Sequence, residues 1–264
     1  MGKTTVSVFA KRHEAGEKIV MITVGSAAES AAAAAAGIDI LLVGDSLGMT
    51  MLGFDTTVPV TMEMMLHHTK AVRRGAPDAF VIFDMPFMSY HTGIDEAVRN
   101  AGRAIQEAGA DAVKLEGGAD PELIRRLVAS GIPVLGHLGL LPQSIQAVGS
   151  YRVVGRDEAE AQRVIAEAHA IEDAGAFAVV LECVPGDLGR RITGELRIAT
   201  IGIGSGAGCS GQVQVLYDTL GISARTPKHA KRFAELGETM RNALAAYAAE
   251  VKAGTFPAPE NTFK

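Results

Sequence analysis

Acidic, basic and imidazole side chains follow apolar, β-branched runs at five successive places along the chain. These residues are Asp45, Asp84, Glu116, His137 and Glu182. Lys114 comes two residues before Glu116, so both side chains lie on the same face of an extended segment. Such groups can bind a divalent cation, hold an anionic substrate and move protons. A single residue of this kind is most often a loop-capping residue, whereas five in succession indicate a site.

The three acids Asp45, Asp84 and Glu116 predict a metal site built from oxygen ligands. Burying unpaired carboxylates costs free energy, so clustered acids need a cation or protons. Oxygen ligands favour Mg²⁺ or Mn²⁺ over zinc. Lys114 can neutralise a carboxylate or carbonyl oxygen of a substrate. Glu182 lies further around the ring of strand ends, where it can act as a general base outside the metal shell.

Short apolar runs alternate with longer amphipathic segments along nearly the whole chain. The runs predict strands at residues 18–24, 38–43, 79–85, 111–116, 132–137, 176–184, 198–205 and 213–217. Apolar residues at the helical period predict helices at 61–74, 94–108, 121–129 and 157–174. Glycine follows several of these segments directly, which is typical of a helix C-terminus.

This alternation, with strands that are apolar throughout, predicts a parallel sheet covered by helices on both faces. Eight strands in 264 residues match a closed (β/α)₈ TIM barrel, in which the C-terminal ends of the strands meet at one mouth. A doubly wound open sheet is the competing fold. No linker-like run divides the chain, so we expect a single domain over residues 1–264, with a last helix at 227–252.

Composition excludes several classes of protein. Lys and Arg number 25 against 30 Asp and Glu, and a net charge of −5 without a basic stripe argues against a nucleic-acid binder. Cys183 and Cys209 are too few for a disulfide framework or a cysteine zinc site. Residues 1–17 do not resemble a signal peptide, and the apolar runs are too short to cross a membrane. We therefore expect a cytoplasmic protein with no membrane partner.

Residues 206–211 fit the pattern G-x-G-x-x-G, which in some folds binds dinucleotides. That motif opens a helix and is followed by an acidic residue about 20 positions later. Here a strand-like run follows, and position 231 is Lys. We therefore predict no dinucleotide site at these glycines.

Six motifs, in this order, carry a resemblance to a known family. They are Val43–Met49, Asp84–Tyr90, Val113–Gly118, Gly136–Leu140, Glu182–Pro185 and Ile201–Gly204. With these motifs the chain closely resembles the ketopantoate (3-methyl-2-oxobutanoate) hydroxymethyltransferases of pantothenate biosynthesis. The resemblance extends from about residue 5 to the last helix.

The resemblance implies a (β/α)₈ barrel, a Mg²⁺ site and a homo-decamer built as a pair of pentameric rings. It also implies transfer of a hydroxymethyl group from 5,10-methylenetetrahydrofolate to 3-methyl-2-oxobutanoate, giving 2-dehydropantoate. By the family pattern the metal residues are Asp45, Asp84 and Glu116, with Asp84 acting partly through water and substrate. The residues that bind or line the 2-oxoacid are Asp45, Ser46, Asp84, Lys114 and His137. Glu182 is the implied proton acceptor.

The chain departs from the family pattern at three places. Val24-Gly25-Ser26 stands where Ala-Tyr-Asp is usual after the first strand, Leu141 replaces Thr, and Ser210 replaces Asp. None of these changes removes a proposed metal ligand or the base, but they leave altered ketoacid specificity open. Two rival functions remain: a Mg²⁺-dependent barrel aldolase or lyase acting on a related 2-oxoacid without folate, and a catalytically silent binding or assembly protein.

Overall fold

The computed structural model describes residues 4–117, 120–150 and 152–263, so Gly118, the last residue of the third motif, lies outside them. Contacts divide the chain into two compact units, Met1–Val215 and Leu216–Lys264, which we describe separately. The expectation of a single domain over residues 1–264 stays a prediction.

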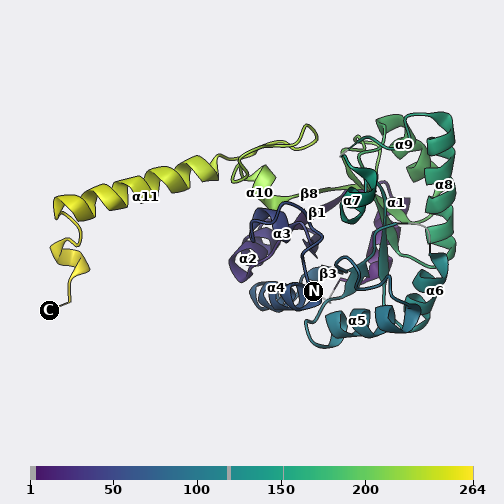
Figure 1. Ribbon diagram of the computed structural model, residues 1–264, viewed down its shortest axis with the longest axis horizontal. Helices are drawn as coiled ribbons and strands as arrows, with labels where there is room; N and C mark the ends of the chain where they lie inside the picture. Colours follow the sequence, from purple (N-terminus) through teal and green to yellow (C-terminus); the bar gives the residue numbers. More distant parts are fainter. Residues whose placement is uncertain (1–3, 118–119, 151, 264) are drawn as a thin grey trace. The chain divides into compact units, whose positions relative to one another are not determined.

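The first unit contains eight parallel strands that close into a barrel in sequence order (Figure 1). The strands are β1 Ile19–Thr23, β2 Ile40–Val43, β3 Phe80–Asp84, β4 Ala112–Lys114, β5 Val134–Gly139, β6 Ala178–Glu182, β7 Ala199–Ile203 and β8 Gly211–Gln214. Closure comes from β8 pairing with β1, where Ile19 is the partner of Gly211. The predicted closed barrel is therefore confirmed, and the competing open sheet is wrong.

The first unit also contains helices, which precede the first strand or follow one of the strands β1 to β6. They are α1 Val6–Glu14, α2 Ala27–Ala35, α3 Leu47–Thr50, α4 Met62–Gly75, α5 Ile94–Gln106, α6 Pro121–Ala129, η1 Pro142–Ser144, α7 Ile145–Val148, α8 Glu158–Asp173 and α9 Gly186–Glu195. Several begin at residues that cap the free N–H groups of a first helical turn. The side chains of Thr61, Asp120 and Asp157 each accept a backbone N–H in this way.

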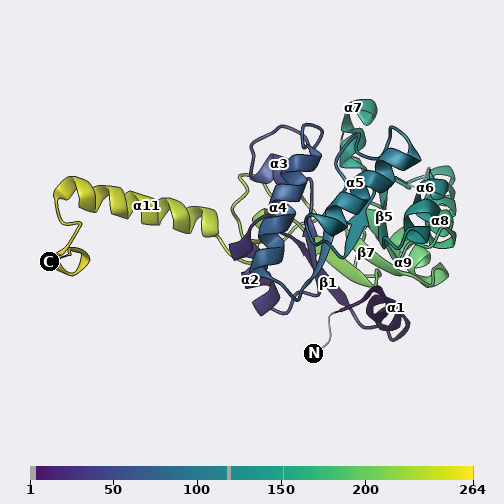
Figure 2. The same ribbon diagram turned by 90° about the horizontal axis from the view of Figure 1, so that it is seen from below.

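The two ends of the barrel differ in what lies over them. Figure 2 shows α1 at one end of the barrel and α3 and α7 at the other. At the α1 end, Phe9 packs on Phe80 and Phe177, with ring centroids 5.0 and 6.0 Å away. At the other end the strands finish and the loops that follow them begin, which is where (β/α)₈ barrels place their active sites.

Side chains from every strand, together with Phe9 of α1, fill the barrel interior, and where a strand contributes more than one they are two residues apart. The cluster comprises Phe9, Ile19, Met21, Ile40, Leu42, Phe80, Ile82, Ala112, Leu135, Ala178, Val180, Ala199, Ile201, Ile203 and Val213. Because side chains alternate between the two faces of a strand, the next inward position on β3, β4, β5 and β6 lies at the mouth. Those positions are Asp84, Lys114, His137 and Glu182.

The connection from β7 to β8, residues 204–210, contains no helix. It returns to the start of the barrel as a glycine-rich loop pressed against α9. A Cβ on Gly206, whose φ is +77°, would lie 3.0 Å from the Cα of Gly186. A Cβ on Gly208 would lie 2.8 Å from the Cβ of Arg190. Close packing thus explains the glycine spacing of residues 206–211.

The second unit contains α10 Leu216–Thr219, α11 Leu236–Ala253 and η2 Pro259–Asn261. The helix predicted at 227–252 begins only at Leu236. Turns precede it, in which the Arg232 guanidinium donates to Thr226 Oγ1 at 2.6 Å and to the Ser223 carbonyl at 3.2 Å. No helix in the described part of the chain combines the length and apolar character that crossing a bilayer requires.

Candidate active site

The mouth of the barrel brings together the charged residues that the sequence places at strand ends. The Lys114 ammonium lies 2.6 Å from Asp84 Oδ1 and 3.6 Å from Glu116 Oε1. All three side chains are at most 5% exposed. Asp45, directly after β2, donates its backbone N–H to Asp84 Oδ2 at 3.2 Å. The side chains predicted to form one site are therefore neighbours in space.

His137 lies between two carboxylates. Its Nδ1 is 3.5 Å from Glu116 Oε1 and its Nε2 is 3.1 Å from Glu182 Oε2, although neither contact has hydrogen-bond alignment. Burial and the Lys114 charge lower the pKa of His137, but Glu116 and Glu182 outweigh them and raise it to about 9. The Glu182 side chain is 16% exposed, so its carboxylate borders both the site and solvent.

The buried groups at the mouth carry more carboxylates than ammonium groups, and their pKa values are shifted. Burial raises the pKa of Asp45 well above its ordinary value, and the charges of Asp84 and Glu116 raise it further. Burial also raises the pKa of Asp84, against the opposing charge of Lys114. Burial lowers the pKa of Lys114, yet the surrounding carboxylates outweigh it and raise the pKa, so Lys114 remains an ammonium group. One buried ammonium thus faces three buried carboxylates.

Ser46, the remaining predicted substrate residue, lies directly after Asp45 at the start of α3. Its side chain makes no capping hydrogen bond to the helix that it precedes. Its carbonyl oxygen instead accepts the Thr50 hydroxyl at 3.1 Å. The Ser46 hydroxyl is thus not committed to holding the helix, which suits its predicted role in binding substrate.

Two further residues of the site, Gln143 and Tyr90, were not predicted from the sequence, although Tyr90 ends the motif Asp84–Tyr90. Gln143, in η1, donates from its backbone N–H to Glu116 Oε2 at 3.0 Å and from Nε2 to Asp45 Oδ2 at 2.9 Å. Tyr90, in the loop between β3 and α5, donates its hydroxyl to Gln143 Oε1 at 2.8 Å. A neutral residue in a loop carries no periodic or charge signal, so only the three-dimensional structure reveals these contacts.

The three departures from the family pattern fall in different places. A Cβ on Gly25 would lie 2.5 Å from Met51 Sδ, so Met51 occupies space that a larger residue would need. Leu141 lies beside Gly117, whose Cβ would be 3.7 Å from the leucine Cδ1. Ser210 instead bonds His13 Nδ1 at 2.8 Å, at the end of the barrel remote from the mouth. Only the first two departures therefore border the loops at the mouth.

The donor chemistry of the mouth fits a hard divalent cation. Asp45 Oδ2 accepts a hydrogen bond from Gln143, whereas Oδ1 takes none from the described residues. The carboxylate oxygens and their excess negative charge suit Mg²⁺. Among the described residues, no three His, Cys, Asp or Glu side chains converge as a ready-made metal-binding group. Mg²⁺ commonly takes only one or two carboxylates and completes its shell with water and substrate oxygens.

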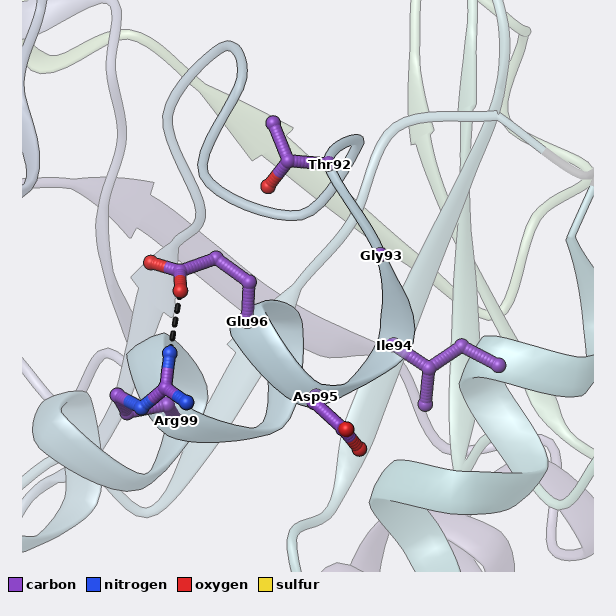
Figure 3. A pocket seen from close by; sticks show the side chains of 6 residues that line it. All are labelled: Thr92, Gly93, Ile94, Asp95, Glu96 and Arg99. Atoms are coloured by element: carbon purple, nitrogen blue, oxygen red, sulfur yellow. Dashed lines mark hydrogen bonds and ion pairs between the residues drawn. The ribbon is translucent and has the colours of Figure 1, made fainter.

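A pocket of about 520 Å³ lies at the start of α5, away from the row of carboxylates. It is lined by Thr92, Gly93, Ile94, Asp95, Glu96 and Arg99 (Figure 3). Glu96 and Arg99 form an ion pair within it. None of the predicted site residues lines this pocket. We assign it no function.

Comparisons with known proteins agree on one family. A family model described as Ketopantoate hydroxymethyltransferase matches residues 3–259. A protein named 3-methyl-2-oxobutanoate hydroxymethyltransferase from Syntrophus aciditrophicus (strain SB) is 55% identical over 263 residues, which are 99% of this chain and 97% of that protein. A protein of the same name from Carboxydothermus hydrogenoformans is 52% identical over 265 residues, covering 100% and 96%.

A solved structure has a similar fold. The phosphoenolpyruvate phosphomutase from Streptomyces platensis subsp. rosaceus matches with a TM-score of 0.62 over 99% of this chain and 92% of that one. At 13% sequence identity, this likeness bears on the fold alone.

Proposed function

Because the chain belongs to the ketopantoate hydroxymethyltransferase family, we propose that it transfers a hydroxymethyl group from 5,10-methylenetetrahydrofolate to 3-methyl-2-oxobutanoate, giving 2-dehydropantoate. The observation that carries the proposal is the continuous row of charged groups at the barrel mouth. It runs from Glu182 through His137, Glu116 and Lys114 to Asp84, with adjacent groups 2.6 to 3.6 Å apart.

We assign a Mg²⁺ ion to the carboxylates of Asp45, Asp84 and Glu116. Three carboxylates buried beside a single ammonium group support the assignment: burial raises the pKa of Asp45 and Asp84, and the neighbouring Glu116 charge adds to both shifts. When bound there, Mg²⁺ would act as a Lewis acid toward the keto oxygen of the substrate. Asp84 also holds the Lys114 ammonium at 2.6 Å, so the same carboxylate would contribute to the metal site and fix a cationic group for the 2-oxoacid.

Lys114 and Ser46, with His137 lining the site, are assigned to holding the 2-oxoacid. Lys114 supplies a fixed positive charge for its anionic end, because buried carboxylates keep the amine protonated. The Ser46 hydroxyl and the loop after β2 lie beside Asp45, where the keto end would sit. These contacts would orient the substrate so that its C3 hydrogen faces Glu182.

Glu182 is the proposed general base. C3 of 3-methyl-2-oxobutanoate carries two methyl groups and one hydrogen, so the base must approach a tertiary carbon. Glu182 ends β6 on the inner face of the barrel, with its carboxylate 3.1 Å from His137 Nε2. A protonated His137 favours the ionised carboxylate, which accepts the C3 proton and leaves the substrate as an enolate able to attack the methylene carbon of the folate. Water then supplies the hydroxyl oxygen of the product, and tetrahydrofolate leaves.

We further propose a cytoplasmic homo-decamer, built as a pair of pentameric rings, as the family resemblance implies. One feature of the chain supports association between copies. α11 buries none of its residues, and its Met240, Leu244 and Tyr247 are 54%, 64% and 56% exposed. An amphipathic helix with such an exposed apolar face is more stable when that face is covered.

The experiment that tests the function is a turnover assay with a panel of 2-oxoacids, with and without 5,10-methylenetetrahydrofolate, in the presence of Mg²⁺. We expect 2-dehydropantoate from 3-methyl-2-oxobutanoate only when the folate is present. Equal product formation from free formaldehyde or other aldehydes without folate would instead support the rival barrel aldolase. Absence of turnover with every 2-oxoacid would favour the catalytically silent barrel.

A further inference from the structure

Tyr90 and Gln143 lie between two of the carboxylates, and every polar atom of their side chains has a partner. Gln143 Nε2 donates to Asp45 Oδ2 and to the Met85 carbonyl, each at 2.9 Å. Gln143 Oε1 accepts the Tyr90 hydroxyl at 2.8 Å, and the same hydroxyl accepts the Glu116 backbone N–H at 3.2 Å. Both side chains are buried, Tyr90 at 7% and Gln143 at 3% exposure.

The surrounding partners fix the orientation of the Gln143 amide. Both groups that face Nε2, the Asp45 carboxylate and the Met85 carbonyl, can only accept hydrogen bonds. Turning the amide over would direct Oε1 at both of them and would leave the Tyr90 hydroxyl facing an N–H₂ group. The Glu116 backbone N–H supplies the hydrogen bond that the tyrosine oxygen accepts. The tyrosine proton has two acceptors within reach, and Gln143 Oε1 at 2.8 Å is much closer than the Glu116 carbonyl at 3.5 Å.

These contacts connect four different loops of the mouth. Asp45 follows β2, Tyr90 follows β3, Glu116 follows β4 and Gln143 follows β5. Gln143 reaches both carboxylates, since its side chain donates to Asp45 and its backbone N–H donates to Glu116 Oε2 at 3.0 Å. One neutral residue thus sets the direction of two mutually repelling carboxylates.

We propose that Gln143, anchored by Tyr90, is a positioning residue that orients the Asp45 and Glu116 carboxylates for the divalent cation and 2-oxoacid of the proposed function. A neutral amide suits this role better than a basic residue. Lys or Arg at position 143 would neutralise the charge that the cation requires, whereas the amide occupies Asp45 Oδ2 and leaves Oδ1 available. Without the amide, repulsion from Asp84 and Glu116 would favour other rotamers of Asp45.

The proposal is tested by Mn²⁺ binding to the full-length, metal-free protein, measured by calorimetry without any substrate. We expect Gln143→Met to weaken Mn²⁺ binding about 10- to 100-fold, the range typical of residues that orient metal ligands. Tyr90→Phe keeps the amide but removes its anchor, so we expect a smaller loss in the same direction. Tyr90→Phe removes only one oxygen atom and should fold. If Gln143→Met does not fold, the Mn²⁺ affinity of Tyr90→Phe therefore tests the role of the anchored amide.

Thr200→Val is the matched control. Thr200 is fully buried, and its hydroxyl accepts the Ser210 N–H at 3.1 Å and lies 2.7 Å from Thr193 Oγ1, at the end of the barrel remote from the mouth. Its removal also breaks a buried polar network, so we expect lower thermal stability with Mn²⁺ affinity within about twofold of the wild type.

Wild-type Mn²⁺ affinity in folded Gln143→Met and Tyr90→Phe would overturn the proposal, as would an equal loss of affinity in Thr200→Val. Failure of the wild type to bind Mn²⁺ would overturn it too. The proposal rests on the proposed function, but the two are separable. Lack of turnover with 3-methyl-2-oxobutanoate would refute the proposed reaction, while the Mn²⁺ comparison, made without substrate, would still decide the role of Gln143.

Discussion

The substitution Glu182→Gln tests proton transfer separately from the binding of Mg²⁺ and of the 2-oxoacid. Glutamine keeps the shape of the side chain at the end of β6 but cannot accept a proton. We expect the variant to bind Mg²⁺ and the 2-oxoacid nearly as the wild type does. It should lose the exchange of the C3 hydrogen of 3-methyl-2-oxobutanoate with solvent deuterium, a reaction that reports enolisation before folate enters.

The expected loss of exchange is large compared with the effect on folding. A general base contributes about 10²–10⁴-fold, so the barrier should rise by about 2.7–5.4 kcal/mol. For folding, the pKa of His137 lies at about 9 against an ordinary 6.5, which corresponds to about 3 kcal/mol of favourable interaction. Glu116 supplies the larger share and remains in the variant. We therefore expect Glu182→Gln to cost less stability than removal of Glu116 would, and the protein should stay folded.

The assay follows the C3 proton by NMR in D₂O, with Mg²⁺ present and folate absent. Glu172→Gln is the matched control, because Glu172 is 7% exposed and its Oε1 accepts the backbone N–H groups of Arg197 and Ile198. It lies near the end of α8, remote from the mouth. The control should lose stability and keep its exchange rate.

Two results would refute the assignment of Glu182. Exchange at the wild-type rate in Glu182→Gln would remove Glu182 from proton transfer altogether. Loss of Mg²⁺ affinity, rather than of exchange, would make Glu182 a metal ligand and leave His137 as the next candidate for the base.

Three further predictions concern the metal, the assembly and pH. Asp45→Ala should abolish Mg²⁺-dependent binding of the 2-oxoacid with little loss of fold, and unchanged calorimetric affinity would contradict the ligand assignment. The protein should sediment near ten times its 27.5 kDa chain mass, about 275 kDa, and a stable monomer or dimer would contradict the decamer. In the metal-free protein the raised pKa of His137 contributes stability that is complete below pH 6.5 and is lost as the pH rises through about 9. The stability difference between wild type and His137→Gln, from urea unfolding, should therefore shrink by about 3 kcal/mol between pH 6 and pH 10, and a constant difference would contradict the pairing.

The charged residues at the strand ends were predictable from the sequence because side chains alternate between the two faces of a strand. Inward positions on a barrel strand recur every second residue, so the apolar pairs of β3 and β6 lead to Asp84 and Glu182. A charged group that ends an apolar strand is visible in the sequence. The contacts between these groups follow from the parallel order of the strands, which brings all their C-terminal ends together.

The loops were not predictable in the same way. The contacts of Tyr90 and Gln143 depend on backbone conformations after β3 and β5 that no periodicity encodes. The start of the last helix was also predicted wrongly, because a helix was expected from Pro227 and α11 begins at Leu236. The residues before it form turns, in which Arg232 donates to a backbone oxygen and to a side-chain oxygen. Hydrogen bonds within these turns override the local helical preference.

The barrel consists of two arcs of strands with different tasks. Strands β3 to β6 and the loop after β4 carry the charged row, and the loop after β2 carries Asp45, so a change in the spacing of the arc from β2 to β6 alters the reaction itself. Strands β7, β8 and β1 carry none of that row, and their task is to complete the circle. The connection between β7 and β8, which contains no helix, lies within this closing arc. Natural variation and engineered insertions should therefore accumulate in the closing arc, while the reactive arc keeps its length.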